Sequence, residues 1–342
     1  MSRYDQLKQE LKARPRRWLV TGVAGFIGSS LLESLLELDQ PVTGVDNFAT
    51  GRRANLEEVR ARVGPDRFSR FRLVEGDVAS AQVCADAVSG VDLVLHQAAL
   101  GSVPRSIEAP LESNAANVTG HLALLEAARQ AGIRRFVYAS SSSVYGDSEA
   151  LPKLEPGLGR PLSPYAVTKL VNELYASVYG ELHGMETVGL RYFNVFGPRQ
   201  DPQGAYAAVI PKWVAAMIRG ERVLIHGTGE TSRDFCHVAN VVQANLLAAT
   251  VESREALNQA YNVAAGHRTT LAELFGLLRD RLLARHPRLA GQTPEHGPFR
   301  AGDVMHSLAD IGKARRLLGY EPTHTIERGL DESLDWYERN LR

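Results

Sequence analysis

A tyrosine and a lysine four residues apart, Tyr165 and Lys169, form the pair in this sequence with the clearest capacity for chemistry. On a helix that Ser163 or Pro164 begins, this spacing places both side chains on one face, one turn apart. A free tyrosine ionises at about pH 10, but a neighbouring ammonium group favours the phenolate. Tyr165 can therefore act as a general base near neutral pH, while a serine hydroxyl orders the substrate oxygen.

Four consecutive serines precede this pair in the segment RFVYASSSSVYG and supply such hydroxyl groups. Residues 140–143 come directly after an apolar run that is typical of a buried strand. A flexible polar loop is the simpler interpretation of the serines. Their place at the carboxyl end of a parallel strand favours a reactive cluster, because open α/β sheets bind ligands at that edge.

Three glycines, Gly22, Gly25 and Gly28, lie between an earlier apolar run and a helical pattern. Glycines at such a place let the backbone turn tightly and approach a pyrophosphate, which the helix N-terminus stabilises. Asp46 ends the following strand, where it can bind ribose hydroxyl groups and repel a 2′-phosphate. The sequence therefore predicts NAD rather than NADP, although Arg52 and Arg53 leave NADP as an alternative.

Two further strand ends carry residues suited to the same cofactor. Asp77 and Val78 end one strand, where an acid can meet the adenine amino group, although Asp77 could instead cap a helix. Gln97, Ala98 and Ala99 end the next strand, where small residues allow close approach or simply pack well.

Apolar runs alternate with helical patterns from residue 17 onward, which is typical of right-handed βαβ units around a parallel sheet. The fold class is therefore predicted as α/β, a Rossmann-like doubly wound parallel sheet with a smaller C-terminal α/β substrate lobe. Helices are expected near 26–38, 53–62, 80–88, 114–131, 165–183, 208–219, 238–250, 271–284 and 326–341. The domains are expected at 1–16 (an N-terminal helical extension), 17–192 (NAD binding and catalysis) and 193–342 (mainly the substrate lobe, with about 236–262 returning to the first domain).

The overall composition of the chain excludes several classes of function. Its 342 residues carry 39 Lys and Arg against 39 Asp and Glu, so no net field attracts nucleic acid or a membrane. Only Cys84 and Cys236 occur, without paired spacing, which suits a reducing compartment and predicts no structural metal. No apolar run approaches the roughly 20 residues that span a bilayer, and the basic start lacks an apolar signal core. A cytoplasmic protein is expected.

Together these motifs, with LRYFNVFGP and GETSRDFCHV, resemble the extended short-chain dehydrogenase/reductase family over nearly the whole chain. The resemblance is closest to its NAD-dependent nucleotide-sugar epimerases, in particular the bacterial UDP-N-acetylglucosamine 4-epimerases. It implies tightly bound NAD and a catalytic set of Ser141, Tyr165 and Lys169. The implied cofactor-binding residues are Gly22, Gly25, Phe26, Ile27, Gly28, Asp46, Asn47, Asp77, Val78, Gln97, Ala98, Ala99, Asn117, Tyr165, Lys169 and Tyr192.

The same resemblance implies a UDP-sugar site in the C-terminal half. Arg233 and Arg300 are expected on the diphosphate, with Arg268 as a weaker third candidate, because a guanidinium fork suits phosphate oxygens. Asp303 is expected on the uridine ribose, unless it merely forms a surface salt bridge with Arg300. The implied substrate-binding residues are Ser102, Val103, Ser141, Ser142, Ser143, Tyr165, Asn194, Val209, His226, Arg233, Arg268, Arg300, Asp303 and Ser307.

Ser307 bears on the choice of sugar, because a small residue at this motif position in the family leaves room for an N-acetyl group. The sequence therefore predicts reversible C4 epimerisation of UDP-N-acetylglucosamine and UDP-N-acetylgalactosamine, with UDP-glucose and UDP-galactose as further substrates. A uronate 4-epimerase is the first alternative, with Arg105 as the cation near C6. A 4,6-dehydratase is disfavoured, because Ser142 and Ser143 replace its usual acid pair.

A non-catalytic NAD or UDP-sugar sensor on the same fold is the remaining alternative. Such proteins typically lack the tyrosine–lysine pair, which is intact here. The resemblance also implies a homodimer that assembles through a four-helix bundle, built from the helices at 114–131 and 165–183.

Overall fold

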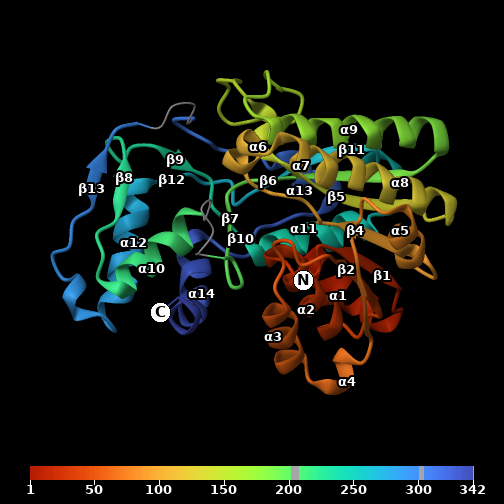
Figure 1. The fold of residues 1–342 in the computed structure, drawn as a ribbon, viewed down its shortest axis with the longest axis horizontal. Helices are drawn as coiled ribbons and strands as arrows, with labels where there is room; N and C mark the ends of the chain where they lie inside the picture. Colours follow the sequence, from red (N-terminus) through yellow and green to blue (C-terminus); the bar gives the residue numbers. More distant parts are fainter. Residues whose placement is uncertain (202–207, 300–303, 342) are drawn as a thin grey trace.

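A parallel sheet of seven strands forms the centre of the computed structural model, which describes residues 1–201, 208–299 and 304–341 (Figure 1). The strand order is β11-β6-β5-β4-β1-β2-β3, and it reverses between β1 and β4, where such sheets bind their ligands. This confirms the predicted Rossmann-like fold. The strands are β1 (Trp18–Thr21), β2 (Val42–Asp46), β3 (Phe71–Glu75), β4 (Leu93–His96), β5 (Arg135–Ser141), β6 (Glu186–Tyr192) and β11 (Gln259–Val263).

Helices cover both faces of the sheet, so its central strands are apolar along their whole length. One face carries α2 (Phe26–Glu37), α3 (Arg53–Val63), α11 (Val238–Thr250) and α13 (Gly312–Leu318), with α4 (Pro65–Phe68) beside them. The other face carries α5 (Ala81–Val88), α8 (Gly120–Gln130) and α9 (Pro164–His183). In Figure 1, α8 and α9 lie side by side along the outer edge of the molecule.

A second hydrophobic core lies in the C-terminal lobe, on the left in Figure 1. Helix α10 packs there against α12 and α14, with the short strand pairs β8–β13 and β9–β12 beside them. The elements of this lobe are α10 (Val209–Arg219), β8 (Leu224–His226), β9 (Ser232–Arg233), β12 (Thr269–Thr270), α12 (Leu271–Leu283), η4 (Pro287–Leu289), β13 (Glu295–Gly297) and α14 (Ile326–Asn340).

Segments of the C-terminal half other than α13 also contact the large sheet. Strand β10 (Cys236–His237) leads into α11, which packs on β4, β5 and β6, and η3 (Arg254–Ala256) precedes β11. Strand β11 pairs in parallel with β6 at the sheet edge. Strand β10 itself pairs with β7 (Val195–Phe196), directly after β6. The chain therefore crosses between the two cores at residues 193–197 and again at 234–238.

The N-terminal helix α1 (Arg3–Ala13) begins at Ser2, whose side chain accepts a hydrogen bond from the amide of Asp5. Leu7 and Leu11 are buried against the first core, which confirms the predicted N-terminal helix. No helix in the described ranges is long and apolar enough to cross a membrane.

The helix expected over 114–131 is interrupted. The chain forms α6 (Val103–Glu108), α7 (Pro110–Asn114), the π-helical turn η1 (Ala115–Thr119) and then α8. Asn117 lies on the π-helical turn and is 1% exposed. Such turns often occur at functional sites, where they redirect one side chain without ending the helix.

Candidate active site

The glycine-rich turn between β1 and α2 leaves no room for a side chain at Gly22 or Gly28. A Cβ on Gly28 would lie 2.0 Å from the carbonyl oxygen of Gly22, and one on Gly22 would lie 2.9 Å from the backbone of Ala98. Gly22 also has a φ of 65°, which favours glycine. Helix α2 begins at Phe26, so its first amides face the cavity that the turn borders. A phosphate fits this arrangement, since helix N-termini bind anions.

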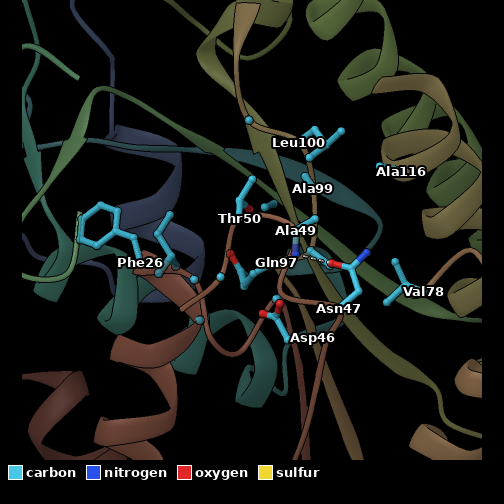
Figure 2. A pocket seen from close by; sticks show the side chains of 18 of the residues that line it. Phe26, Asp46, Asn47, Ala49, Thr50, Val78, Gln97, Ala99, Leu100 and Ala116 are labelled. Atoms are coloured by element: carbon cyan, nitrogen blue, oxygen red, sulfur yellow. Dashed lines mark hydrogen bonds between the residues drawn. The ribbon is translucent and has the colours of Figure 1, made fainter. Parts of the chain in front are cut away.

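A cavity of about 690 Å³ extends from this turn along the carboxyl edge of the sheet. Figure 2 shows Asp46 at the end of β2 and Asn47, Ala49 and Thr50 on the loop that follows it, with Gln97, Ala99 and Leu100, from the segment after β4, lining the same pocket. The expected cofactor residues that line it are Gly22, Gly25, Phe26, Ile27, Gly28, Asp46, Asn47, Asp77, Val78, Gln97, Ala98, Ala99, Tyr165, Lys169 and Tyr192.

Asp46 is 7% exposed and accepts hydrogen bonds from the backbone amides of Ala24 and Phe48, both at 2.8 Å. Burial raises the pKa of its carboxyl group above the ordinary value. Asp77 accepts a hydrogen bond from the Asn47 side chain at 2.9 Å. The helix that Asp77 might have capped, α5, has Ser80 at its N-cap position, so the capping alternative is wrong.

Three polar side chains, of which Gln97 and Tyr192 line this cavity, form a closed ring. Tyr192 donates its hydroxyl hydrogen to Gln97 at 2.9 Å, Gln97 donates to Asn245 at 3.0 Å, and Asn245 donates to Tyr192 at 2.9 Å. Each partner therefore fixes the orientation of the next. Asn245 was not among the expected residues, yet it had a sequence signal: it is an asparagine within α11, a helix otherwise rich in buried apolar residues.

The tyrosine and lysine predicted as a reactive pair lie on the first two turns of α9, which Ser163 caps. Lys169 is 3% exposed and donates to the carbonyl oxygen of Ala139 at 2.9 Å. Burial lowers the pKa of Lys169 to about 8. Burial raises the pKa of Tyr165, and a hydrogen bond with Ser141 opposes that shift. Ser141, Tyr165 and Lys169 all line the cavity beside the glycine-rich turn.

The neighbouring serines have different surroundings. Ser142 and Ser143 begin the 3₁₀ helix η2 (Ser142–Tyr145), whose start Ser141 caps by accepting from the amide of Ser143 at 3.1 Å. Neither lines the cavity. The Ser143 hydroxyl is buried and lacks a hydrogen-bond partner among the described residues. It is therefore a polar group in need of a partner.

Asn117 does not line the cavity, contrary to its assignment as a cofactor-binding residue. Its side chain accepts from the amide of Leu100 at 2.7 Å and donates to the carbonyl oxygen of Leu100 and to the Thr168 hydroxyl. These bonds occupy the side-chain amide of Asn117. Asn117 therefore connects Leu100, which lines the cavity, to Thr168 on α9 from outside the cavity.

Ser102 and Val103 also lie outside the cavity wall. The Ser102 hydroxyl caps α6 by accepting from the amide of Arg105, and Val103 is exposed. Their neighbours Gly101 and Pro104 do face the two cavities.

A second cavity of about 530 Å³ adjoins the first and shares Asn194, Val195 and Gln200 with it. Val209, His226 and Arg233 line it, as expected. Asn194 has a φ of 32°, a left-handed conformation that asparagine tolerates better than most residues. The side chain of Arg233 donates to the carbonyl oxygens of Ser232 and Met305. The Nδ1 atom of His226 contacts the carbonyl oxygen of Pro298 at 3.1 Å.

Several residues that were not expected from the sequence also line this second cavity and determine its charge and its apolar surface. Trp213 and Phe235 supply flat apolar walls, and the basic residues outnumber the acidic ones. The charged lining residues are Lys212, Arg219, Glu221, Arg222 and Arg233. This lining suits an anion that carries a flat ring, because cations bind phosphate oxygens and aromatic faces stack on bases. For Lys212, Trp213 and Arg219 the available signal was their helical spacing on α10.

The last four expected substrate residues have different outcomes. Arg268 lines a separate cavity with Glu273 and Asp280, so the structure does not place it with the other substrate residues. Ser307 lines neither of the two cavities; it is half-buried, and its amide donates to the carbonyl oxygen of Ser232, next to Arg233. Arg300 and Asp303 lie outside the described residues.

The donor set of the site matches a dinucleotide and not a metal. Among the described residues, no three His, Cys, Asp or Glu side chains are arranged to hold a metal ion. Cys84 and Cys236 are buried free thiols.

Comparison with known proteins identifies similar chains over nearly the full length. The family model "NAD dependent epimerase/dehydratase family" matches residues 18–264. A UDP-glucose 4-epimerase of Mycolicibacterium smegmatis is 34% identical over 328 residues, which cover 94% of this chain and 98% of that protein.

Two solved structures with different sugars are also similar. One is a UDP-N-acetylglucosamine 4-epimerase from Methanobrevibacter ruminantium in complex with UDP-N-acetylmuramic acid. It is 35% identical, has a TM-score of 0.85, and the match covers 94% of this chain and 98% of that one. The other is a UDP-glucuronic acid 4-epimerase from Bacillus cereus in complex with UDP-glucuronic acid and NAD. It is 28% identical with a TM-score of 0.82, and the match covers 94% and 99%.

Proposed function

The chain belongs to the NAD-dependent epimerase/dehydratase family and is an NAD-dependent UDP-sugar 4-epimerase, and we propose that UDP-N-acetylglucosamine and UDP-N-acetylgalactosamine are its preferred substrates. One observation carries the proposal. The reactive cluster of Ser141, Tyr165 and Lys169 lies in the dinucleotide cavity, which continues past Asn194 into a cavity lined by cations and aromatic rings.

The two cavities divide the substrate and cofactor between them in this proposal. NAD lies along the first cavity, with its pyrophosphate at the glycine-rich turn and its adenosine ribose at Asp46. The UDP group lies in the second cavity, with Arg233 at the diphosphate. The sugar then lies at the junction, beside Tyr165 and Asn194.

Tyr165 accepts the proton of the sugar 4-hydroxyl and later returns it. NAD, when bound, supplies a reversible hydride acceptor for C4, so the reaction is redox neutral overall. The Ser141 hydroxyl, already bonded to Tyr165, orders the 4-oxygen. Lys169 contributes its ammonium charge, which offsets the cost of a buried phenolate. The junction of the two cavities must also let the 4-keto sugar rotate, so that the hydride can return to the opposite face of C4.

The preference for N-acetylated sugars rests on Ser307. Ser307 lines neither cavity itself, but its amide is bonded to Ser232, the neighbour of the cavity residue Arg233, and in this proposal a larger side chain at this position reduces the space for the 2-substituent of the sugar. The uronate alternative depends on a cation near C6. Arg105 is half-buried on α6 and does not line either cavity, so nothing in its position favours that alternative over the N-acetylated pair.

A substrate panel tests this preference. UDP-glucose, UDP-N-acetylglucosamine and UDP-N-acetylglucosaminuronate are each incubated with the wild type and with Ser307→Tyr, and C4 inversion is followed by proton NMR. We expect the wild type to favour the N-acetylhexosamine. Ser307→Tyr should lose at least about tenfold in kcat/KM on it, because overpacking a sugar site costs 1 kcal/mol or more, while UDP-glucose is spared.

Each rival has its own result in this panel. Equal losses on all sugars would contradict the role of Ser307, and faster turnover of the uronate would favour the uronate epimerase. Loss of water from the substrate would identify a dehydratase. Binding of UDP-sugar without any turnover would identify a sensor.

We also propose that the protein forms a homodimer through α9 and the α7–α8 segment. Helix α9 carries an exposed apolar stripe of Val167, Leu174, Val178 and Leu182, which are 45–72% exposed. Leu111 on α7 is 84% exposed beside it. A second copy with the same surface would bury both stripes in a four-helix bundle.

A further inference from the structure

Two arginines follow the β2 strand at the adenosine end of the first cavity, and each is paired with an acid. Arg52 contacts Asp201 at 2.5 Å, and Arg53 contacts Glu75 at 2.5 Å while its guanidinium lies 4.1 Å from the centre of the Phe48 ring. Arginines at this place in a dinucleotide-binding fold serve to accept a 2′-phosphate. Their pairing therefore bears on the choice between NAD and NADP.

The backbone at Arg52 lies close to Asp46, the carboxylate that is expected to bind the ribose. A Cβ on Gly51, its neighbour, would lie 2.7 Å from an oxygen of Asp46. The amide of Arg52 donates to the carbonyl oxygen of Ala24, on the glycine-rich turn. The Arg52 side chain is 46% exposed and does not itself line the cavity, but Thr50 and Gly51, directly before it, do.

Asp201 comes from a distant part of the sequence, after β7, and a buried anchor holds its segment. Arg199 is 6% exposed, has a φ of 69°, and forms a salt bridge with Glu33 on α2. It also donates to the Ser30 hydroxyl at 3.3 Å. Gln200, the next residue, lines the dinucleotide cavity. The segment from 199 to 201 is therefore fixed against α2, which brings Asp201 to Arg52.

We propose that Asp201 is a cofactor-specificity residue that keeps the enzyme selective for NAD by occupying Arg52. Around the ribose end the acids are Asp46, Glu75, Asp77 and Asp201, against the bases Arg52 and Arg53. A 2′-phosphate would thus meet an excess of negative charge and two arginines that already bind carboxylates. The 2′-hydroxyl of NAD meets no such penalty.

The proposal rests on the NAD assignment but not on the reaction, because its test reads bound nucleotide. Wild type and Asp201→Asn are equilibrated with equal excess concentrations of NAD and NADP, freed of unbound nucleotide by rapid gel filtration, and their bound NADP:NAD ratio is measured by chromatography. We expect the ratio to rise about tenfold in Asp201→Asn, the gain of one charge-assisted hydrogen bond. Added salt should reduce the gain.

Two control variants decide whether the gain comes from Arg52. The double variant Arg52→Ala/Asp201→Asn should return to the wild-type ratio, because it lacks the guanidinium. Glu75→Gln removes one negative charge from the same end and releases Arg53 instead of Arg52. The Arg53 guanidinium still stacks on the Phe48 ring, so this variant should change the ratio less than Asp201→Asn does. An unchanged ratio in Asp201→Asn overturns the proposal. An equal gain in the double variant or in Glu75→Gln also overturns it.

Discussion

At the scale of single residues, the chemistry depends on two buried side chains, Tyr165 and Lys169. Burial by itself disfavours the charged form of each. Burial lowers the pKa of Lys169 to about 8 and raises the pKa of Tyr165. A phenolate and an ammonium stabilise each other when they are close, and the Lys169 nitrogen lies 5.9 Å from the centre of the Tyr165 ring. The pair is therefore expected to work best where Tyr165 has lost its proton and Lys169 has kept its own.

Lys169→Met tests this coupling through the pH dependence of kcat. Without the ammonium the pKa of Tyr165 rises, so the ascending limb of the profile should move to higher pH by roughly one to three units. Lys169→Arg keeps the charge and should move the limb less. The profiles are measured on enzyme whose NAD content has been determined. An ascending limb at the same pH in Lys169→Met and the wild type would show that the lysine does not tune the base.

Much of the site at this scale could be predicted from the sequence. The glycines, Asp46, Tyr165 and Lys169 are recognisable because a strand or helix end at known spacing carries them. Asn117 was expected on the cofactor but does not line the cavity, since the pattern could not show that its side-chain amide would bond to Leu100 and Thr168. Asn245 was missed because only tertiary packing brings α11 beneath Gln97 and Tyr192.

At the scale of elements, a buried polar network joins α9 to the strands that carry the serines and Tyr192. Glu173, one turn after Lys169, forms a bidentate salt bridge with Arg191 and accepts from the Ser140 hydroxyl. Arg191 donates to the Tyr145 hydroxyl, which donates to Asn262. The network therefore fixes β5, β6, η2 and the catalytic helix relative to one another.

Glu173→Gln should destabilise the fold by about 3 kcal/mol, because it leaves the Arg191 charge buried without its carboxylate. The Arg191 and Glu173 side chains are 5% and 11% exposed. Asp147→Asn is the matched control, since Asp147 pairs with Arg160 at 3.5 Å at the surface and should contribute under about 1 kcal/mol. Denaturant unfolding of both variants measures the difference. A similar, small change in both would contradict the importance of the buried pair.

The regular elements were predictable, and their irregularities were not. Apolar periodicity indicated α1, α2 and α9, and Ser163 marked the start of α9 correctly. The π-helical turn at Ala115–Thr119 has no proline or glycine within it that could have predicted it, and it carries Asn117, which bonds to Leu100 and Thr168. Long-range contacts of this kind override local propensity.

At the scale of the whole molecule, the substrate site exists only because distant segments meet. Lys153, in the loop after η2, forms a β-bridge with Ala309, and Ser232 forms one with His306. Asn262 on β11 donates to the carbonyl oxygens of Lys153 and Asp310. These bonds attach the segment that follows Ser307 to both cores. No local pattern predicted them, because their partners are 74 or more residues apart in all but one case.

The proposed homodimer can be tested on this scale with Leu174→Glu/Leu182→Glu. Charges on the exposed apolar stripe of α9 should prevent the four-helix bundle and halve the mass measured by light scattering after size-exclusion chromatography. Leu224→Glu is the control, because Leu224 is 45% exposed on the C-terminal lobe, away from α9. A monomeric wild type, or a double variant of unchanged mass, would contradict the proposed interface.

The most direct test of the whole account uses UDP-N-acetylglucosamine that carries deuterium at C4 of the sugar. If the hydrogen on C4 leaves and returns within one turnover, UDP-N-acetylgalactosamine should form with the deuterium still at C4, and no label should reach the solvent. Tyr165→Phe should form no product while it keeps bound NAD. Product with protium at C4, loss of water from the substrate, or undiminished inversion in Tyr165→Phe would contradict the account.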